Sequence, residues 1–135
     1  MDFIEVAAAV IKKDGFYLCA QRKVSKYNYL SKKFEFPGGK VEEGETLQEA
    51  LIREIYEELG VKIFVQQKIK NVKHCYPDFN VDIAFFACNL IDNNNLSNLE
   101  HEKIIWMEAQ ELISLDWAAA DIPIVNLLCD NKLES

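Results

Sequence analysis

Hydrophobic and polar positions alternate along this chain in short runs that predict strands interleaved with helices. Apolar or alternating runs bounded by turn residues are typical of strands. Such runs lie at residues 3–12, 16–21, 34–36, about 61–73, about 79–90 and 104–107. Turn signals at Lys13-Asp14-Gly15 and Tyr76-Pro77-Asp78 predict hairpins. The run at 34–36 is expected to stop at Pro37-Gly38-Gly39.

Two segments carry the signals of helices. Thr46 to Leu59 is the clearest, because Thr46 and Glu49 can form a capping box and Gly60 suits a left-handed C-cap. A second helix is expected over about 119–129, and loops at 23–33 and 92–101. The 135 residues therefore predict a single domain, 1–135, of the α/β (α+β) class, with helices packed on a mixed sheet.

One face of the first helix begins apolar and continues as carboxylates. The apolar stripe consists of Leu47, Ala50 and Leu51. Seven residues further along, the same face carries Glu54, Glu57 and Glu58. A solvated row of charges normally lies opposite the buried stripe, so this placement suggests a chemical role for the glutamates.

The alternative is a solvated helix end held by salt bridges. Four residues after these glutamates only Glu58 finds a partner, Lys62, and Glu54 with Glu58 forms a destabilising like-charge pair. Three neighbouring carboxylates require a divalent cation or a raised pKa. Their hard oxygen atoms suit Mg²⁺ or Mn²⁺. Gly38-Gly39, just upstream, lets the backbone approach a ligand closely and offers a further carbonyl oxygen.

Composition narrows the possible partners. The net charge of −7 disfavours duplex nucleic acid and anionic membranes, and a small anionic substrate would need a bound cation. There is no apolar run long enough to span a bilayer and no basic start typical of a secretion signal, so a cytoplasmic location is expected. The four cysteines lack zinc-site spacing and are expected to be reduced and structural.

The residues around the first helix resemble a known family. Gly39, five residues, Glu45, seven residues and Arg53-Glu54-Ile55-Tyr56-Glu57-Glu58-Leu59-Gly60-Val61 fill every fixed position of the Nudix box, 39–61. Phe34-Glu35-Phe36-Pro37-Gly38-Gly39-Lys40 resembles the segment before the box in MutT-type triphosphate pyrophosphohydrolases. Ala119-Ala120-Asp121-Ile122-Pro123 resembles the tail of a MutT relative that prefers cytosine nucleotides. The resemblance implies the Nudix fold, a mixed β-sheet sandwiched between helices.

The resemblance also implies roles for the matching residues. Those expected to hold Mg²⁺ or Mn²⁺ are Glu54, Glu57, Glu58, Glu100 and the carbonyl of Gly38. Arg53 would orient the glutamates for catalysis, and Glu45 would brace the loop. Those expected to bind substrate are Arg22, Phe36, Gly38, Gly39, Lys40 and Asp121. The implied reaction is attack of water at the β-phosphorus of a nucleoside triphosphate, which yields a monophosphate and pyrophosphate.

Several functions fit this resemblance. A MutT-type enzyme would act on 8-oxo-dGTP or on CTP and dCTP, as a monomer or homodimer. Other Nudix hydrolases act on ADP-ribose or dinucleoside polyphosphates, and some Nudix-fold modules bind without catalysis but tend to lose box glutamates, which this chain keeps.

Individual side chains leave further alternatives open. Asp121 either reads the base or caps the last helix. His74 and His101 are expected to be structural or surface residues, and Trp106 and Trp117 core residues. Tyr27 and Tyr29 either stack on a base or are ordinary loop aromatics.

Overall fold

The computed structural model describes residues 2–91 and 96–130, and its elements are interleaved as the sequence predicts. The strands are β1 (Phe3–Lys13), β2 (Phe16–Gln21), β3 (Phe34–Glu35), β4 (Gly38–Lys40), β5 (Ile63–Cys75), β6 (Asn80–Leu90) and β7 (Lys103–Met107). The helices are α1 (Leu47–Leu59) and α2 (Ile122–Cys129), with the short 3₁₀ helices η1 (Ala109–Ser114) and η2 (Ala119–Asp121). The predicted loop at 92–101 lies partly outside the described residues.

The strands form a mixed sheet in the order β3-β2-β1-β6-β5, with β4 paired to β1 and β7 paired to β2. β1 and β6 run parallel from Phe3 opposite Asn80 to Ile11 opposite Cys88, and the other pairs are antiparallel. The β1–β2 turn has positive φ at both Asp14 (52°) and Gly15 (87°), as a two-residue type I′ hairpin requires. The predicted hairpins and the mixed sheet are confirmed.

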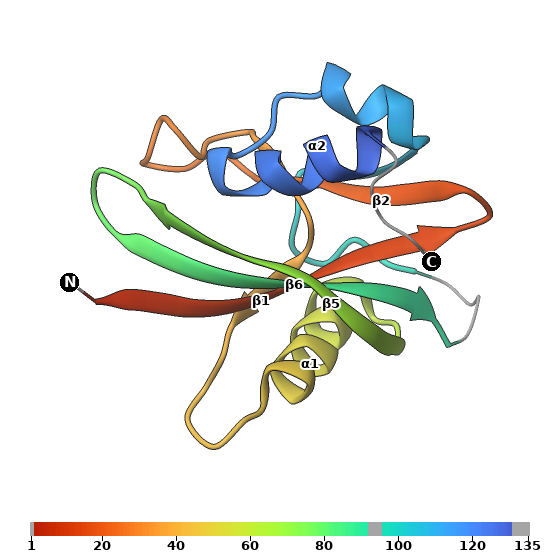
Figure 1. The fold of residues 1–135 in the computed structure, drawn as a ribbon, viewed down its shortest axis with the longest axis horizontal. Helices are drawn as coiled ribbons and strands as arrows, with labels where there is room; N and C mark the ends of the chain where they lie inside the picture. Colours follow the sequence, from red (N-terminus) through yellow and green to blue (C-terminus); the bar gives the residue numbers. More distant parts are fainter. Residues whose placement is uncertain (1, 92–95, 131–135) are drawn as a thin grey trace.

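The two faces of β1 pack against different helices (Figure 1). Ala7, Ala9 and Ile11 share a core cluster with apolar residues of α1. Ala8 and Val10 share the opposite cluster with residues of η1 and α2. Because successive strand residues point to opposite faces, a continuous apolar run is what a strand covered on both sides needs. The sheet is sandwiched between helices, as expected.

Local signals fix both ends of α1. The Thr46 side chain accepts a hydrogen bond from the backbone N–H of Glu49, and the Glu49 side chain accepts one from the N–H of Thr46. Gly60 ends the helix in the left-handed region, at φ 68°. The predicted capping box and C-cap are confirmed.

Two elements of the irregular segments were not predicted from the sequence. Gly38-Gly39 is not only a stop, because residues 38–40 form β4 against β1. The chain pairs with β2 as far as Glu35 in β3, crosses through Phe36 and Pro37, and then pairs with β1 as β4. η1 was also missed, since its sequence has no side-chain N-cap.

No helix in the described part of the chain is long and apolar enough to cross a membrane.

Candidate active site

Two hollows lie side by side and share a wall. One, of about 470 Å³, is mainly apolar and aromatic in its lining, and the other, of about 710 Å³, is lined by charged residues. Both are bounded by Arg22, Glu35, Gly38, Gly39 and Lys40. The predicted substrate-binding residues Arg22, Gly38, Gly39 and Lys40 therefore meet at the boundary between a pocket suited to a base and a pocket suited to charged groups.

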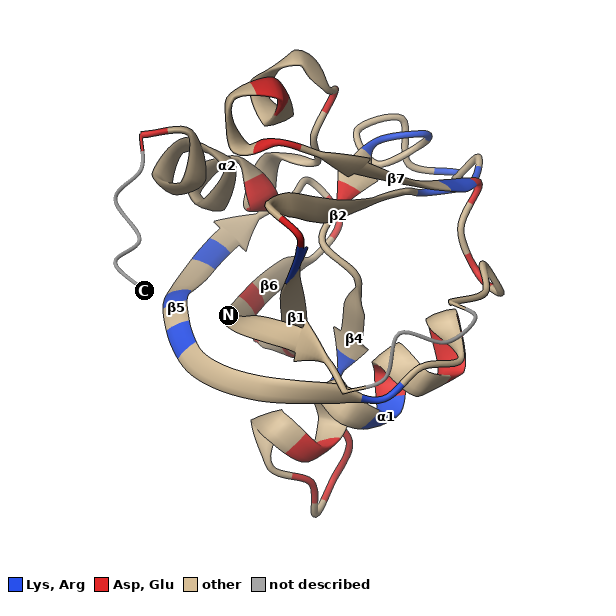
Figure 2. Ribbon diagram, turned by 90° about the vertical axis from the view of Figure 1, so that its right-hand side faces the viewer, with Lys and Arg blue, Asp and Glu red and all other residues tan. Residues whose placement is uncertain are grey.

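The carboxylates of α1 differ in exposure. The side chain of Glu58 is 8% exposed, that of Glu54 is 18% exposed and that of Glu57 is 57% exposed. The predicted row of three therefore holds for Glu54 and Glu58, whereas Glu57 lies on the outer side of the helix. Glu54 and Glu58 line the charged hollow together with Glu100, which the chain brings in from the loop before β7. Figure 2 shows acidic residues on α1 and on the loop that precedes it.

Arg53 connects the box loop to these carboxylates. Its Nε and Nη2 donate to the two oxygens of Glu45 at 2.6 and 3.0 Å. Its Nη1 donates to Glu54 at 3.0 Å and to Glu57 at 3.3 Å, and Nη2 also donates to the carbonyl of Lys40 at 3.0 Å. Hydrogen bonds from Arg53, and then from the N–H of Glu42, lower the pKa of Glu45 to about 2. Arg53 therefore links Glu45, Glu54 and Glu57, which are contacts that the orienting and bracing roles implied by the resemblance would require.

Glu58 is a buried carboxyl in a field of other carboxyls. Burial above all, then a hydrogen bond with Glu54 and the charges of Glu35, Glu54 and Glu100, raises its pKa to about 10. Its Oε1 is buried and has no hydrogen-bond partner among the described residues. A buried carboxylate oxygen left unpaired is costly, and a hard cation would satisfy it.

The carboxylates are not arranged as a finished metal site. Within residues 2–91 and 96–130, no three His, Cys, Asp or Glu side chains are grouped so that they would hold a metal ion as they stand. The hollow nevertheless fits Mg²⁺ or Mn²⁺, because Glu54, Glu58 and Glu100 bring carboxylates to it and Oε1 of Glu58 is buried without a partner among the described residues.

The two glycines of the shared wall are required by close packing. A Cβ on Gly38 would collide with the backbone carbonyl of Ala7 and the Cα of Ala8. A Cβ on Gly39 would collide with the carboxylate of Glu54. The close approach predicted for this pair is therefore to β1 and to a glutamate of α1.

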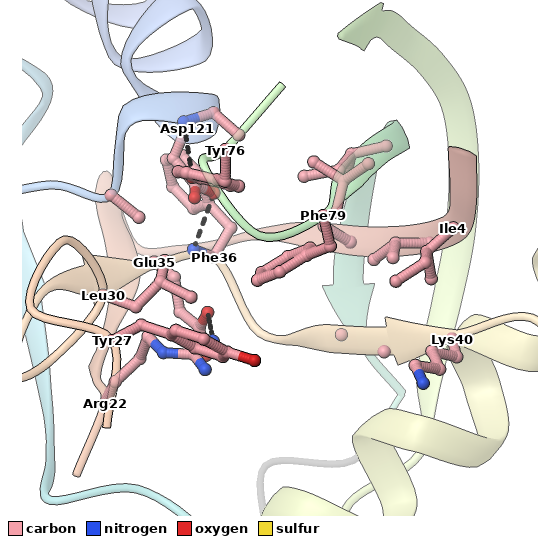
Figure 3. Close-up of a pocket in the computed structure, with 18 of the residues that line it drawn as sticks. Ile4, Arg22, Tyr27, Leu30, Glu35, Phe36, Lys40, Tyr76, Phe79 and Asp121 are labelled. Carbon is pink, nitrogen blue, oxygen red and sulfur yellow. Dashed lines mark hydrogen bonds and ion pairs between the residues drawn. The ribbon is translucent and has the colours of Figure 1, made fainter. Parts of the chain in front are cut away.

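The apolar hollow is closed at one end by Phe36, Tyr76 and Asp121, with Lys40 at the other end (Figure 3). Phe36 is 3% exposed and packs against Trp117, with ring centroids 4.8 Å apart. The backbone N–H of Phe36 donates to Oδ1 of Asp121 at 3.3 Å. Burial, and then the charge of Glu35, raises the pKa of Asp121 well above its usual value.

The alternative role for Asp121 does not hold. Asp121 occupies the N-cap position of α2, but its side chain makes no capping hydrogen bond. It lines the apolar hollow instead.

Some residues of the site escaped the sequence analysis. Glu35 lines both hollows and accepts hydrogen bonds from Arg22 Nη1 and from His101 Nε2, both at 2.9 Å. Its position between two buried phenylalanines was the available signal, because alternation turns it to the other face of β3. His101 is buried, as a structural residue would be, yet it lines the charged hollow. Tyr76 and Phe79 line the apolar hollow, and no local pattern in the sequence indicated this role.

Comparison with known proteins agrees with this geometry. The NUDIX domain family matches residues 6–127. The chain belongs to the Nudix family. Its Nudix domain is similar to the CTP pyrophosphohydrolase of Escherichia coli (strain K12), with 35% identity over 126 residues that cover 93% of this chain and 90% of that protein.

Two further Nudix relatives extend the comparison. The 8-oxo-dGTP diphosphatase of Escherichia coli (strain K12) is 25% identical over 125 residues, or 93% of this chain and 95% of that one. The solution structure of a MutT protein from methicillin-resistant Staphylococcus aureus 252 has a TM-score of 0.74 and 38% identity, over 96% of this chain and 98% of the other. The chain is a MutT-type Nudix hydrolase that acts on phosphoanhydride bonds.

Proposed function

We propose that this enzyme hydrolyses a (deoxy)nucleoside triphosphate to the monophosphate and pyrophosphate, with Mg²⁺ or Mn²⁺ as its cofactor. The observation that carries the proposal is the wall of Arg22, Glu35 and residues 38–40 between an aromatic hollow and a carboxylate-lined one. A nucleotide has the same division, since its base is flat and aromatic and its phosphates are charged. We expect a cytoplasmic monomer or homodimer whose partner is this small molecule, with no duplex nucleic acid and no membrane.

The charged hollow supplies the residues for hydrolysis. Glu54, Glu58 and Glu100 would hold the metal, with Glu57 and the Gly38 carbonyl as further oxygen donors. The divalent cation that these residues would hold would neutralise the triphosphate and lower the pKa of a water molecule. Arg53 holds Glu54 and Glu57 in place, and one of the glutamates orients or deprotonates the attacking water.

Basic residues at the shared wall would meet the phosphates. Arg22 and Lys40 line both hollows in a protein whose net charge is −7. Local positive charge is what allows an acidic protein to accept an anion. Phe36, in the wall of the apolar hollow, offers a face to the base.

Asp121 supports cytosine nucleotides, CTP or dCTP, as substrates. One of its oxygens accepts from the N–H of Phe36, which leaves the other for a ligand in the apolar hollow. An ionised carboxylate accepts only, so it suits the exocyclic amine of cytosine. The similarity to a CTP pyrophosphohydrolase points the same way.

A second candidate is 8-oxo-dGTP. Because burial raises the pKa of Asp121, its neutral form can donate a hydrogen bond to a base carbonyl. The relative named 8-oxo-dGTP diphosphatase supports this candidate.

The reaction is tested by a screen of nucleotides with Mg²⁺ and with EDTA. The enzyme is expected to release pyrophosphate from a nucleoside triphosphate with Mg²⁺ and to release none in EDTA. Release of inorganic phosphate, or AMP from ADP-ribose or a dinucleoside polyphosphate, would assign the enzyme to another Nudix branch. Binding of nucleotide without turnover of any compound would indicate a non-catalytic module.

The base is tested by comparing kcat/KM for dCTP and 8-oxo-dGTP in the wild type and in Asp121→Asn. An asparagine both donates and accepts, so the ratio is expected to move toward 8-oxo-dGTP by about tenfold or more, the usual value of one hydrogen bond to a base. An unchanged ratio would mean that Asp121 does not read the base.

A further inference from the structure

His101 lines the charged hollow and lies beside two of its carboxylates, Glu35 and Glu58. Its side chain is 4% exposed. Its Nε2 lies 2.9 Å from Oε2 of Glu35 and 3.8 Å from Oε1 of Glu58. In the tautomer that carries its hydrogen on Nε2, the ring donates to this carboxylate oxygen of Glu35. The second distance is too long for a hydrogen bond, so Glu58 faces the ring without being bound to it.

The backbone around His101 leaves the ring little freedom to move. The side chain of Asn98 donates to the carbonyl of His101 at 2.8 Å and accepts from its N–H at 2.9 Å. The N–H of Leu99 donates to the carbonyl of Glu58 at 3.0 Å, and the N–H of Glu102 donates to the carbonyl of Gln21 at 2.8 Å. The loop is therefore attached both to the end of α1 and to β2.

Glu35 links His101 to Arg22, a residue of the wall that the two hollows share. Its Oε1 accepts from Nη1 of Arg22 at 2.9 Å, while its Oε2 accepts from His101. Burial is the main cause of the raised pKa of both Glu58 and Asp121, and the charge of Glu35 contributes to both shifts. The charge of Glu35 therefore acts on a carboxyl of the charged hollow, Glu58, and on a carboxyl of the apolar hollow, Asp121.

Two buried atoms beside this contact lack partners. Oε1 of Glu58 and Nδ1 of His101 make no hydrogen bond with any described residue. Leaving such atoms unpaired costs free energy. Without a ligand, Glu58 and His101 therefore stay in this position only if other contacts hold them there. Here those contacts are the hydrogen bond to Glu35 and the fixed backbone of the loop.

We propose that His101 is a positioning residue that couples binding of the divalent cation to binding of the nucleotide. The imidazole holds Glu35 against Arg22 at the shared wall and sets the position of Glu35 relative to Glu58. A nucleotide that engages Arg22 and Glu35 therefore changes the surroundings of Glu58, and a cation at Glu58 changes those of Glu35. This inference rests on the proposed function, because it takes Glu58 as a residue that holds the metal.

Such coupling is reciprocal and is measured as a ratio of binding constants. The test titrates the full chain with Mn²⁺ by calorimetry, alone and with a saturating nucleoside monophosphate. The monophosphate is CMP or 8-oxo-dGMP, according to which triphosphate the wild type hydrolyses. The nucleotide is expected to change the Mn²⁺ Kd of the wild type by about 5-fold or more, the lower end of typical coupling.

Two variants separate the hydrogen bond from the packing of the ring. In His101→Phe the ring remains but the donor is lost, so the ratio is expected to fall to about 1. In His101→Gln the amide N–H can still donate to Glu35, so most of the coupling is expected to remain. Glu102→Gln is the control, because it removes a neighbouring exposed carboxylate that forms an ion pair with Lys32. This variant is expected to keep the wild-type ratio.

The outcomes are distinct. A wild-type ratio of 1, full coupling in His101→Phe, or loss of coupling in both His101 variants would each overturn the inference. Failure of the wild type to release pyrophosphate from any triphosphate would instead overturn the proposed function. Circular dichroism of each variant checks that the fold is intact, and His101→Gln decides the matter if His101→Phe does not fold.

Discussion

Arg53 donates a hydrogen bond to each carboxylate oxygen of Glu45, from Nε at 2.6 Å and from Nη2 at 3.0 Å. The remaining nitrogen, Nη1, is thereby directed at Glu54, 3.0 Å away. A planar guanidinium can satisfy all three oxygens at once, and an ammonium group cannot. The geometry of Glu54 consequently depends on a residue of the loop before α1.

Arg53→Lys is expected to lower kcat/KM while the protein stays folded. Loss of a group that orients metal-holding side chains typically costs about 10–100-fold in activity or metal affinity. Steady-state kinetics at saturating Mg²⁺, with a thermal melt of the same preparation, measures both quantities. Glu43→Gln, an exposed carboxylate in the same loop, is the control. Equal activity in Arg53→Lys and the control would contradict the orienting role.

Gly38→Ala and Gly39→Ala are expected to fail in different ways. The new Cβ at position 39 meets the end of a flexible side chain, Glu54, which can move. Activity should therefore fall by on the order of 100-fold, as a displacement near 1 Å can cause, with the stability changed by less than about 1 kcal/mol. The new Cβ at position 38 meets the backbone of β1, which cannot move aside as a side chain can. The free energy of unfolding is therefore expected to fall by about 1–3 kcal/mol.

Urea unfolding and kcat of both glycine variants check this pair of predictions. A Gly39→Ala protein with wild-type kcat would show that Glu54 does not have to occupy its present position. A Gly38→Ala protein as stable as the wild type would show that β4 can move away from β1.

Mg²⁺ or Mn²⁺ is expected to stabilise the folded protein. A cation that binds only the native state stabilises it by about 2.7 kcal/mol at 100 times its Kd, or roughly 5–10 °C in Tm for a domain of this size. In Glu58→Gln the buried carboxyl is replaced by a neutral group, so this gain should be largely lost while the Tm in EDTA stays the same or rises. Thermal melts with EDTA and with saturating metal give the comparison. A full metal-induced shift in Glu58→Gln would remove Glu58 from the metal site.

Stability should fall with rising pH because of Asp121. Its pKa in the folded state lies above the unfolded value of about 3.8, so the native state binds the proton more tightly. The stabilisation is fully present below pH 3.8 and is lost as the pH rises toward the folded-state pKa. Arg22 opposes the shift and Glu35 adds to it.

The corresponding experiment compares the Tm of the wild type and of Asp121→Asn in EDTA across this range. The variant lacks the titrating group, so the difference in Tm, wild type minus variant, should decrease as the pH rises. Since Glu58 titrates in both proteins, its contribution cancels. A difference that does not vary with pH would mean that Asp121 is ionised in the folded protein as easily as in the unfolded one.

Local features of the structure were predictable because local interactions determine them. The capping residues Thr46 and Glu49 lie within one helical turn, and the β1–β2 hairpin is fixed by its turn. The apolar stripe of α1 gave the right face for Glu54 and Glu58. It failed at Glu57 because seven residues fall about 20° short of two full turns, which leaves this position at the edge of the buried sector.

The contacts that complete the site depend on topology. Glu35 meets His101 across 66 residues of sequence, and no spacing rule predicts that β3 and the loop before β7 lie on either side of β2. The crossing at Phe36 and Pro37 takes the chain from pairing with β2 to pairing with β1. It also depends on which strand offers an unpaired edge. The position of the carboxylates on α1 could thus be predicted from the sequence, while their partners required the fold.

The hydrogen bond from the N–H of Phe36 to Asp121 spans 85 residues. Phe36 and Asp121 come together only when the N-terminal and C-terminal parts of the chain are both in place, because a domain folds as a unit. The apolar hollow, which both residues help to line, is therefore completed only when the last segment of the chain has packed against the sheet.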